Sequence, residues 1–217
     1  MLRTLGATAA CGALGLALLV SSAYAQPARP AGPPPAPPAA SKDPAAAPAG
    51  AYKLDPGHTS LIARLGHMNG FSYSTFRFGT VSGTLNWNPA APENSKVDIT
   101  VDPKSIMTPV QGFAEELGGD RFLNVGKYPD AHFVSTSIQR TGPTTGVITG
   151  NLTLMGQTRP ITIKAEMVGA GRGMRGTVIG FTGIAHFKRS DFGFSAMIPI
   201  IADDVELLID TEFDAQG

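Results

Sequence analysis

The chain has 217 residues, and its 17 lysines and arginines balance 17 aspartates and glutamates, so that the formal net charge at pH 7 is zero. A chain without excess positive charge has no general electrostatic attraction to nucleic acid or to an anionic membrane surface, and nucleic-acid binding is therefore not expected. A single cysteine, Cys11, excludes an internal disulfide and a cage of thiolate metal ligands.

The first 25 residues have the pattern of a secretory signal peptide. Arg3 is their only charged residue, an apolar run begins at Cys11, and Ala23-Tyr24-Ala25 matches the small-x-small cleavage pattern. The run is too short for a bilayer-spanning helix, which needs about 20 residues. We therefore expect export to the periplasm, with release into the medium as the alternative. The mature chain would have neither a transmembrane segment nor a cysteine.

Residues 26–50 consist almost wholly of proline, alanine and glycine. Such a composition offers few side chains for a core and disfavours helix and sheet, because proline lacks a backbone N–H. The segment is expected to form a semi-extended polyproline II tether, with a proline-rich ligand for a partner protein as the alternative. Residues 51–217 then form one domain, long enough to bury a core of its own.

Within this domain, apolar and polar residues alternate with a period of two, which is typical of half-buried β-strands. The alternation predicts eight strands. Most are separated by short turns that contain proline or glycine, so that sequence neighbours should pair antiparallel. In chain order, the predicted strands are Thr59–Leu65, Thr75–Trp87, Val97–Val101, His132–Ile138, Val147–Met155, Ile161–Met167, Thr177–Phe187 and Val205–Phe213.

Two connections are candidates for a short helix. Pro109–Gly118 has a proline suited to a helix start and a glycine suited to its end, and a second short helix is compatible with His67–Ser72. Neither could cover the apolar face of the sheet, so the strands must close into a barrel or fold into a sandwich. Glycines within the strands favour closure because they permit coiling and bulges. We predict an all-β fold, an eight-stranded antiparallel barrel with one or two short helices in its connections.

No arrangement of reactive side chains points to catalysis. The chain has no nucleophile elbow, and its neighbouring carboxylates are interpreted as solvated or turn-holding residues. The histidines lack the spacing of a helical or finger-type metal site. We therefore predict a protein that is not an enzyme and that holds no metal or cofactor. The four histidines are His58, His67, His132 and His186.

The phenylalanines suggest an apolar binding site. Any single one is best explained as a core residue, but several lie in predicted connections, where apolar side chains are unexpected unless the loops fold over a shared cavity. The candidates in connections are Phe71, Phe113, Phe122, Phe192 and Phe194. The candidates in strands are Phe76, Phe78, Phe133 and Phe181.

Five motifs, taken in this order and spacing, carry a resemblance to a known family. They are Leu54–Ser60 (LDPGHTS), Asn124–Thr136 (NVGKYPDAHFVST), Gly150–Pro160 (GNLTLMGQTRP), Lys188–Gly193 (KRSDFG) and Asp203–Leu207 (DDVEL). The chain resembles the YceI-like family of periplasmic, lipocalin-like proteins over essentially all of residues 52–214.

The resemblance implies a lipocalin-like barrel whose apolar interior holds a long isoprenoid, a quinone-like molecule or a similar amphiphilic lipid. No enzymatic activity is firmly attached to this fold. Transfer of each ligand methylene from water into such an interior would gain roughly 0.8 kcal/mol. We expect a periplasmic carrier or scavenger. The alternative is a stress-related interaction module whose barrel is filled by its own side chains, and a monomer and a homodimer are both compatible with the sequence.

Two departures from the family bear on the ligand headgroup. Glu116 stands where members often carry a histidine, and Lys188 replaces the usual asparagine before Arg189. If the long connection caps the barrel mouth, the carboxylates of Glu115 and Glu116 would favour a neutral quinone or fatty amide over an anionic pyrophosphate. Arg189 is interpreted either as the partner of Asp191 in a local salt bridge or as a headgroup donor at the rim.

Overall fold

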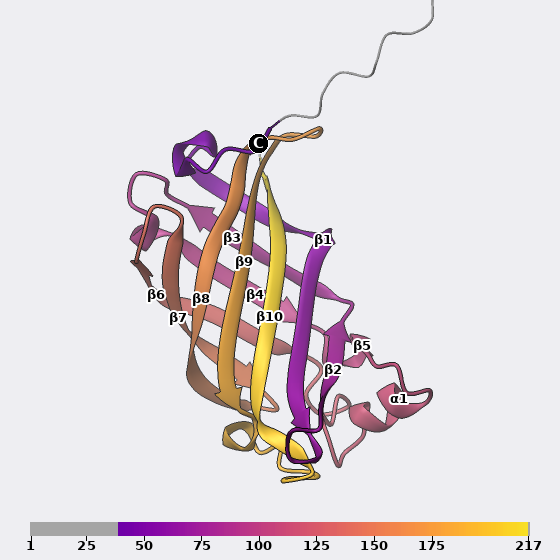
Figure 1. Ribbon diagram of the computed structural model, residues 1–217. Coiled ribbons are helices and arrows are strands. Elements are labelled where there is room, and N and C mark those ends of the chain that lie inside the picture. The colour runs from indigo at the N-terminus through magenta and orange to yellow at the C-terminus, as the bar shows by residue number, and fades with distance from the viewer. Residues whose placement is uncertain (1–38, 217) are drawn as a thin grey trace, which may run out of the picture. The chain divides into compact units, whose positions relative to one another are not determined.

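The computed structural model describes residues 39–216, which form one antiparallel β-structure (Figure 1). The predicted signal peptide and the first part of the predicted tether lie outside the described residues. The strands are β1 (Gly50–His67), β2 (Ser72–Phe78), β3 (Val81–Trp87), β4 (Lys96–Val101), β5 (Ile106–Met107), β6 (Ala131–Arg140), β7 (Thr145–Leu154), β8 (Gln157–Arg172), β9 (Thr177–Lys188) and β10 (Ile201–Ala215).

The sheet closes into a barrel because β10 pairs with β9 on one side and with β1 on the other. The closed ring has eight strands, in the order β1, β10, β9, β8, β7, β6, β4, β3 and back to β1. The eight-stranded antiparallel barrel predicted from the sequence is confirmed. The predicted strand Thr75–Trp87 is divided at Gly79 and Thr80 into β2 and β3, and the short β5 pairs with β2 beside the ring.

The period-two pattern sets the two faces of the barrel wall. In β8, Ile161 and Met167 are buried, while Lys164 and Glu166 between them are exposed. In β10, Val205 and Phe213 are buried at 5% and 3% exposure. A strand points successive side chains to opposite faces, so the apolar set of each strand points into the barrel.

β1 changes partners along its length. Its first residues, Gly50–Lys53, pair with β3, whereas Leu61–His67 pair with β2. Between them the register against β10 shifts, because the segment from Asp55 to Ser60 is opposed by only Glu212 to Asp210. The side chain of Asp55 accepts a hydrogen bond from the Gly57 N–H at 2.7 Å and holds this irregular turn.

Within residues 39–216, the helical structure of the barrel lies in the connections and in the segment before β1. The helix α1 (Phe113–Gly118) begins after Gly112 rather than at Pro109, because Gly112 has the left-handed φ of 78° that precedes the first helical residue. The second candidate is a single 3-10 turn rather than a helix. The 3-10 turns are η1 (Pro44–Ala46), η2 (Met68–Gly70), η3 (Pro92–Asn94), η4 (Pro103–Ser105) and η5 (Arg189–Phe192).

The two ends of the barrel differ. One end, called here the η1 end, carries η1, η3, the β6–β7 and β8–β9 turns and the end of β10. The other, the α1 end, carries η2, the long connection with α1, and the β9–β10 connection. Figure 1 shows α1 near one end of the strands and the C-terminus at the other.

Residues 39–49, which the sequence analysis assigned to the tether, lie against the barrel wall. Ser41 pairs with Ala170 of β8, with N–H to O distances of 2.8 Å in both directions. Ala47 is fully buried, and the Tyr52 hydroxyl donates to the Pro48 carbonyl oxygen at 2.7 Å. Burial also raises the pKa of Tyr52. This segment, which we call the strap, therefore belongs to the folded unit.

Among the residues that the structure describes, no helix is both long and apolar enough to cross a bilayer.

Candidate functional site

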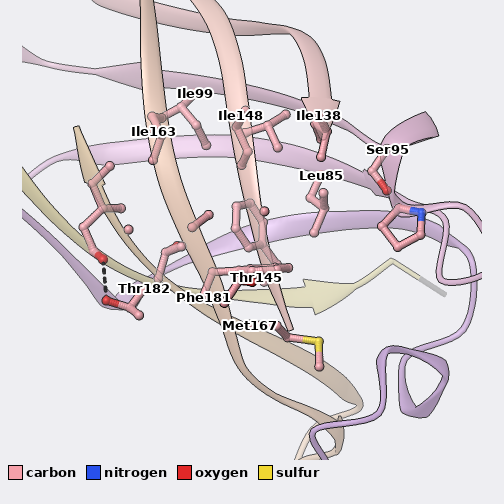
Figure 2. Close-up of a pocket in the computed structure, with 18 of the residues that line it drawn as sticks. Leu85, Ser95, Ile99, Ile138, Thr145, Ile148, Ile163, Met167, Phe181 and Thr182 are labelled. Atoms are coloured by element: carbon pink, nitrogen blue, oxygen red, sulfur yellow. Dashed lines mark hydrogen bonds between the residues drawn. The ribbon is translucent and has the colours of Figure 1, made fainter. Parts of the chain in front are cut away.

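A cavity of about 200 Å³ lies inside the barrel. Its wall is made of inward-pointing side chains from eight strands, and Figure 2 shows several of them converging on the same space. Within residues 39–216, the buried residues of two apolar clusters contribute to this wall, whereas the buried residues of the two clusters at the α1 end do not. Apolar lining residues include Leu54, Leu61, Val81, Leu85, Trp87, Val97, Ile99, Phe133, Ile138, Ile148, Ile161, Ile163, Ala165, Met167, Phe181, Leu207, Ile209 and Phe213.

The hydroxyl groups within the wall are largely paired with protein. Thr59 and Thr211 form a hydrogen bond of 3.1 Å between their hydroxyls, and Thr59 also donates to the Asp55 carbonyl oxygen. Thr182 donates to the carbonyl oxygen of Ile209 at 3.3 Å. The deep part of the cavity therefore presents hydrocarbon and few free polar atoms, which suits an apolar chain.

The cavity reaches solvent at the β6–β7 turn. Among the described lining residues, Arg140, Pro143 and Thr145 are exposed, and all three belong to this turn or its flanks. Pro44 of η1 and Pro92 of η3 also line the cavity at the η1 end. We call this opening, formed by the β6–β7 turn beside η1 and η3, the mouth.

Two glycines make room for large side chains of the wall. A Cβ at Gly150 would lie 2.3 Å from the Phe133 ring and 2.5 Å from the Val134 carbonyl oxygen. A Cβ at Gly83 would lie 2.5 Å from a methyl group of Ile99. Both contacts are too short for real atoms, so any larger residue at these positions would displace a cavity-lining side chain.

The YceI-like domain model matches residues 52–213 of this sequence. The chain belongs to the YceI-like family. Among curated relatives, the UPF0312 protein of Shewanella sp. strain W3-18-1 is 37% identical over 167 residues, which are 76% of this chain and 87% of the relative. The UPF0312 protein of Pseudomonas aeruginosa strain LESB58 is 36% identical over 164 residues, which are 74% of this chain and 85% of the relative.

Solved structures share the barrel of this YceI-like protein. A Campylobacter jejuni YceI protein is 32% identical, with a TM-score of 0.60, over 65% of this chain and 85% of that one. Burkholderia cenocepacia BcnA is 23% identical, with a TM-score of 0.67, over 73% and 98%. A Saccharophagus degradans domain described as polyisoprenoid-binding is 16% identical, with a TM-score of 0.59, over 76% and 98%. At their low identity, the last two show the fold alone.

Two of the nine candidate phenylalanines of this YceI-like protein line the cavity. They are Phe133 of β6 and Phe181 of β9. Phe181 meets Trp87 edge to face, with 5.9 Å between ring centroids, so the single tryptophan of the chain both packs under the η1 end and lines the cavity. Phe133 and Phe181 are therefore the two candidate phenylalanines that the fold brings to the cavity.

The other seven candidates lie elsewhere. Five pack in one apolar cluster at the α1 end with the buried Leu117 and Leu123, and the Phe122 ring meets two others of the five edge to face. Phe192 packs against Phe187 with 5.3 Å between centroids, and Phe71 is 89% exposed on the β1–β2 connection. The loops do fold over the barrel, but they close its other end rather than line the cavity. The five at the α1 end are Phe76, Phe78, Phe113, Phe122 and Phe194.

Arg189 is not at a solvent-exposed rim and does not bind Asp191. Its side chain is 1% exposed, and its guanidinium donates to four backbone carbonyl oxygens at 2.7–3.1 Å. It also lies 4.8 Å from the centroid of the Phe194 ring. Burial lowers the pKa of Arg189. Arg189 therefore holds the β9–β10 connection in place, since its donors are used within the protein. The four acceptors are the carbonyls of Phe194, Ala196, Ile201 and Ala202.

Asp203 supports the same connection. Its carboxylate accepts hydrogen bonds from the Ser190 N–H at 2.9 Å and from the Ser190 hydroxyl at 2.7 Å. Burial opposes the charged form, but these bonds and the nearby Lys188 and Arg189 outweigh it, so the pKa of Asp203 is lowered. Lys188, which departs from the family pattern, lies near this carboxylate and 3.4 Å from that of Asp204.

Glu115 and Glu116 are both exposed on α1. Because α1 lies at the end opposite the mouth, their carboxylates do not face a ligand head placed there. The inference from the sequence that they favour a neutral headgroup depended on the long connection capping the mouth. The structure places that connection at the α1 end, so Glu115 and Glu116 give no reason to expect a neutral headgroup.

One group of potential ligand atoms was not visible in the sequence spacing. Asp55, His58 and Glu212 bring carboxylate oxygens and an imidazole nitrogen within 4.8 Å of one another on the outside of the wall. The His58 Nδ1 lies 2.7 Å from an oxygen of Asp55 and 3.9 Å from one of Glu212. Asp55 raises the pKa of His58, and the His58 hydrogen bond lowers the pKa of Asp55. A surface ion pair accounts for these contacts.

Most of the aliphatic lining and the polar mouth could not be identified from the residue pattern. The period of two identifies which residues share a face, and it could have named Ile161, Ile163 and Met167 as an inward set. It could not tell which part of the inward face surrounds a space and which part is packed. That division depends on which loops fill which end.

Proposed function

We propose that this YceI-like protein binds the hydrocarbon chain of an amphiphilic lipid, isoprenoid or quinone-like, in the barrel cavity. The observation that carries the proposal is an apolar cavity that is continuous with solvent at one end. Transfer of hydrocarbon into such a wall stabilises the complex by roughly 0.8 kcal/mol per methylene, and a chain of several methylenes offsets the cost of association. The description of the Saccharophagus domain as polyisoprenoid-binding supports the same ligand class.

The proposed physiological role is that of a non-enzymatic carrier or scavenger in the periplasm. The predicted signal peptide supports export, and membership of the YceI-like family supports a binding role. A lipid tail in an aqueous compartment needs shielding from water, and a barrel that encloses the tail supplies it. Mass spectrometry of an organic extract of the purified protein would identify a co-purifying lipid.

Trp87 provides a direct measurement of binding. It is the only tryptophan and lines the cavity, so a bound chain should change the intensity or wavelength of its emission. Titration with farnesol or a short-chain quinone should give a saturable change and raise the melting temperature, because a ligand that binds only the folded state stabilises it.

A blocked cavity is the matched control. Ala165→Phe places a ring among the lining side chains, whereas Ala51→Phe adds the same ring at an exposed position of β1 that does not line the cavity. Both variants should keep the circular dichroism of the barrel, but only Ala165→Phe should abolish the fluorescence change. If no lipid co-purifies and no lipid alters Trp87 emission or the melting temperature, the barrel is a ligand-free module and the proposal is wrong.

A further inference from the structure

The mouth contains a cation. Among the lining residues that the structure describes, Arg140 is the only one with a charged side chain. It is exposed, at the end of β6 and directly before the β6–β7 turn. A guanidinium gives no advantage for binding hydrocarbon alone. An amphiphile whose tail lies in the cavity would have its polar head at the mouth, where the guanidinium could contact it.

A β-bulge directs this side chain toward the cavity. Along β6, Phe133 and Ser135 are buried, and the register against β7 then shifts between Ser135 and Ser137. The extra residue changes the alternation, so Ile138 and Arg140 line the cavity and Gln139 does not. Without the bulge, strict alternation from Phe133 would turn Arg140 outward. Bulges are frequent beside functional sites, where they re-aim a side chain.

The guanidinium is positioned but not neutralised. Its Nε donates to the Gly142 carbonyl oxygen at 2.9 Å, which fixes the side chain across the β6–β7 turn. None of the ion pairs within residues 39–216 involves Arg140. Residues 1–38 contain no aspartate or glutamate. The two terminal nitrogens of the guanidinium thus have no acidic side chain of the described chain as their partner.

We propose that Arg140 binds the anionic head of a single-chain amphiphile whose tail occupies the cavity. The shared chemistry is a head with two or more anionic oxygens, either a carboxylate or a phosphate, because a guanidinium matches such oxygens with two parallel hydrogen bonds. Thr144 and Thr145, which also line the mouth, offer hydroxyls beside it. The inference rests on the proposed function and replaces the neutral head expected from Glu115 and Glu116.

The test compares ligands that differ only in the head. Farnesyl phosphate is paired with farnesol and dodecanoate with dodecanol, and each is titrated against the full mature protein by Trp87 fluorescence at low salt. We expect each anion to bind about five- to tenfold more tightly than its alcohol, a modest gain because Arg140 is exposed and water weakens an exposed ion pair. The stronger of the two preferences identifies the phosphate or the carboxylate as the better head.

Two variants assign the effect to Arg140. Arg140→Gln should remove the preference, so that each anion binds no more tightly than its own alcohol to the same variant. Arg172→Gln makes the same charge change at an exposed arginine of the same barrel end that does not line the cavity, and it should keep the preference. Circular dichroism checks that each variant is folded.

The outcomes separate this inference from the proposed function. If alcohols and anions bind equally to the wild type, or if Arg140→Gln keeps the preference, the inference is wrong while the lipid-binding function stands. An Arg172→Gln variant that loses the preference would indicate general electrostatic attraction of the anion instead of a contact with Arg140, and would also overturn the inference. If no member of either pair binds, the proposed function fails and takes the inference with it.

Discussion

At the scale of single residues, Arg189 shows how a buried charge can serve the fold instead of a ligand. Its four hydrogen bonds join the end of β9 to the start of β10 and to the loop between them. Removal of the guanidinium leaves the four accepting carbonyl oxygens without this donor. A buried acceptor without a partner lowers the stability of the fold, because it has lost its hydrogen bond to water as well.

Arg189→Met keeps a flexible apolar side chain about as long as the aliphatic part of arginine but removes all of its donors. We expect the free energy of unfolding to fall by about 3–5 kcal/mol, which urea denaturation would measure. Arg159→Met, at an exposed arginine of β8, is the control and should stay within about 0.5 kcal/mol of the wild type. A similar loss for both variants would show that the carbonyl network around Arg189 contributes little.

The Asp55–His58 pair makes stability depend on pH. The pKa of His58 is raised by Asp55, so its contribution is complete below the ordinary value of 6.5 and is lost as the pH rises through the higher folded-state value. The pKa of Asp55 is lowered mainly by the His58 hydrogen bond, so its contribution is present above 3.8 and is lost as the pH falls through the lower folded-state value. The pair is therefore most effective in mildly acidic solution.

His58→Gln tests this dependence. The difference in stability between the wild type and the variant should be largest near pH 5.5 and should shrink toward pH 8.5, where the imidazole loses its proton, as followed by urea denaturation at about these two values. His186→Gln, at an exposed histidine without an acidic partner in the described ion pairs, should show no such trend. A stability difference that is constant across this range would mean that the pKa of His58 is the same in the folded and the unfolded protein, and would contradict the prediction.

At the scale of elements, the strap differs from what its composition predicts, because it lies against the barrel wall instead of forming a free tether. Proline and alanine do not drive folding, yet Ala47 is fully buried and belongs to the same apolar cluster as Tyr52 and Ile179. Small side chains are what allow the strap to lie so close to β8. A Cβ at Gly169 would lie 2.7 Å from the Cβ of Ala40, so both partners must be small.

Ala47→Asp therefore places an unpaired carboxylate in an apolar cluster. We expect it to lower the free energy of unfolding by more than about 2 kcal/mol, or to release the strap, because a buried charge without a partner is strongly disfavoured. Ala49→Asp makes the same change at an exposed position two residues along and should have little effect. Thermal denaturation of both variants would measure the contrast, and equal melting temperatures would show that the strap is not docked in solution.

At the scale of the whole molecule, the pairing of β1 with β10 completes the ring. The end of β10 meets the beginning of β1, from Tyr52 opposite Ala215 to Asp55 opposite Glu212. Phe213 lies under this seam at 3% exposure and packs against Phe181 with 6.3 Å between ring centroids. Closure thus depends on residues that are more than 150 positions apart in the sequence.

A chain that ends after Asp210 loses this part of the seam. We expect it to lack the near-ultraviolet circular dichroism of the native aromatic residues and to bind a hydrophobic dye, because β1 and the apolar interior beside it lose their cover. A chain that ends after Ala215 keeps the paired residues and should remain native. Native spectra for the shorter chain would indicate that the barrel tolerates an open seam.

The sequence alone determined the fold class and the family, because strand alternation and turn residues are local patterns and the five motifs are contiguous. The bulge in β6 and the partner exchange of β1 depend on the hydrogen-bond register between paired strands, which the alternation of residues does not reveal, and so Arg140 could not be placed in advance. The tertiary structure decided where the cavity lies. Phenylalanines from separate loops pack together at the α1 end, whereas aliphatic side chains of neighbouring strands leave space near η1. Whether a part of the interior is packed or empty depends on side chains from distant positions, and these side chains meet only in the closed barrel.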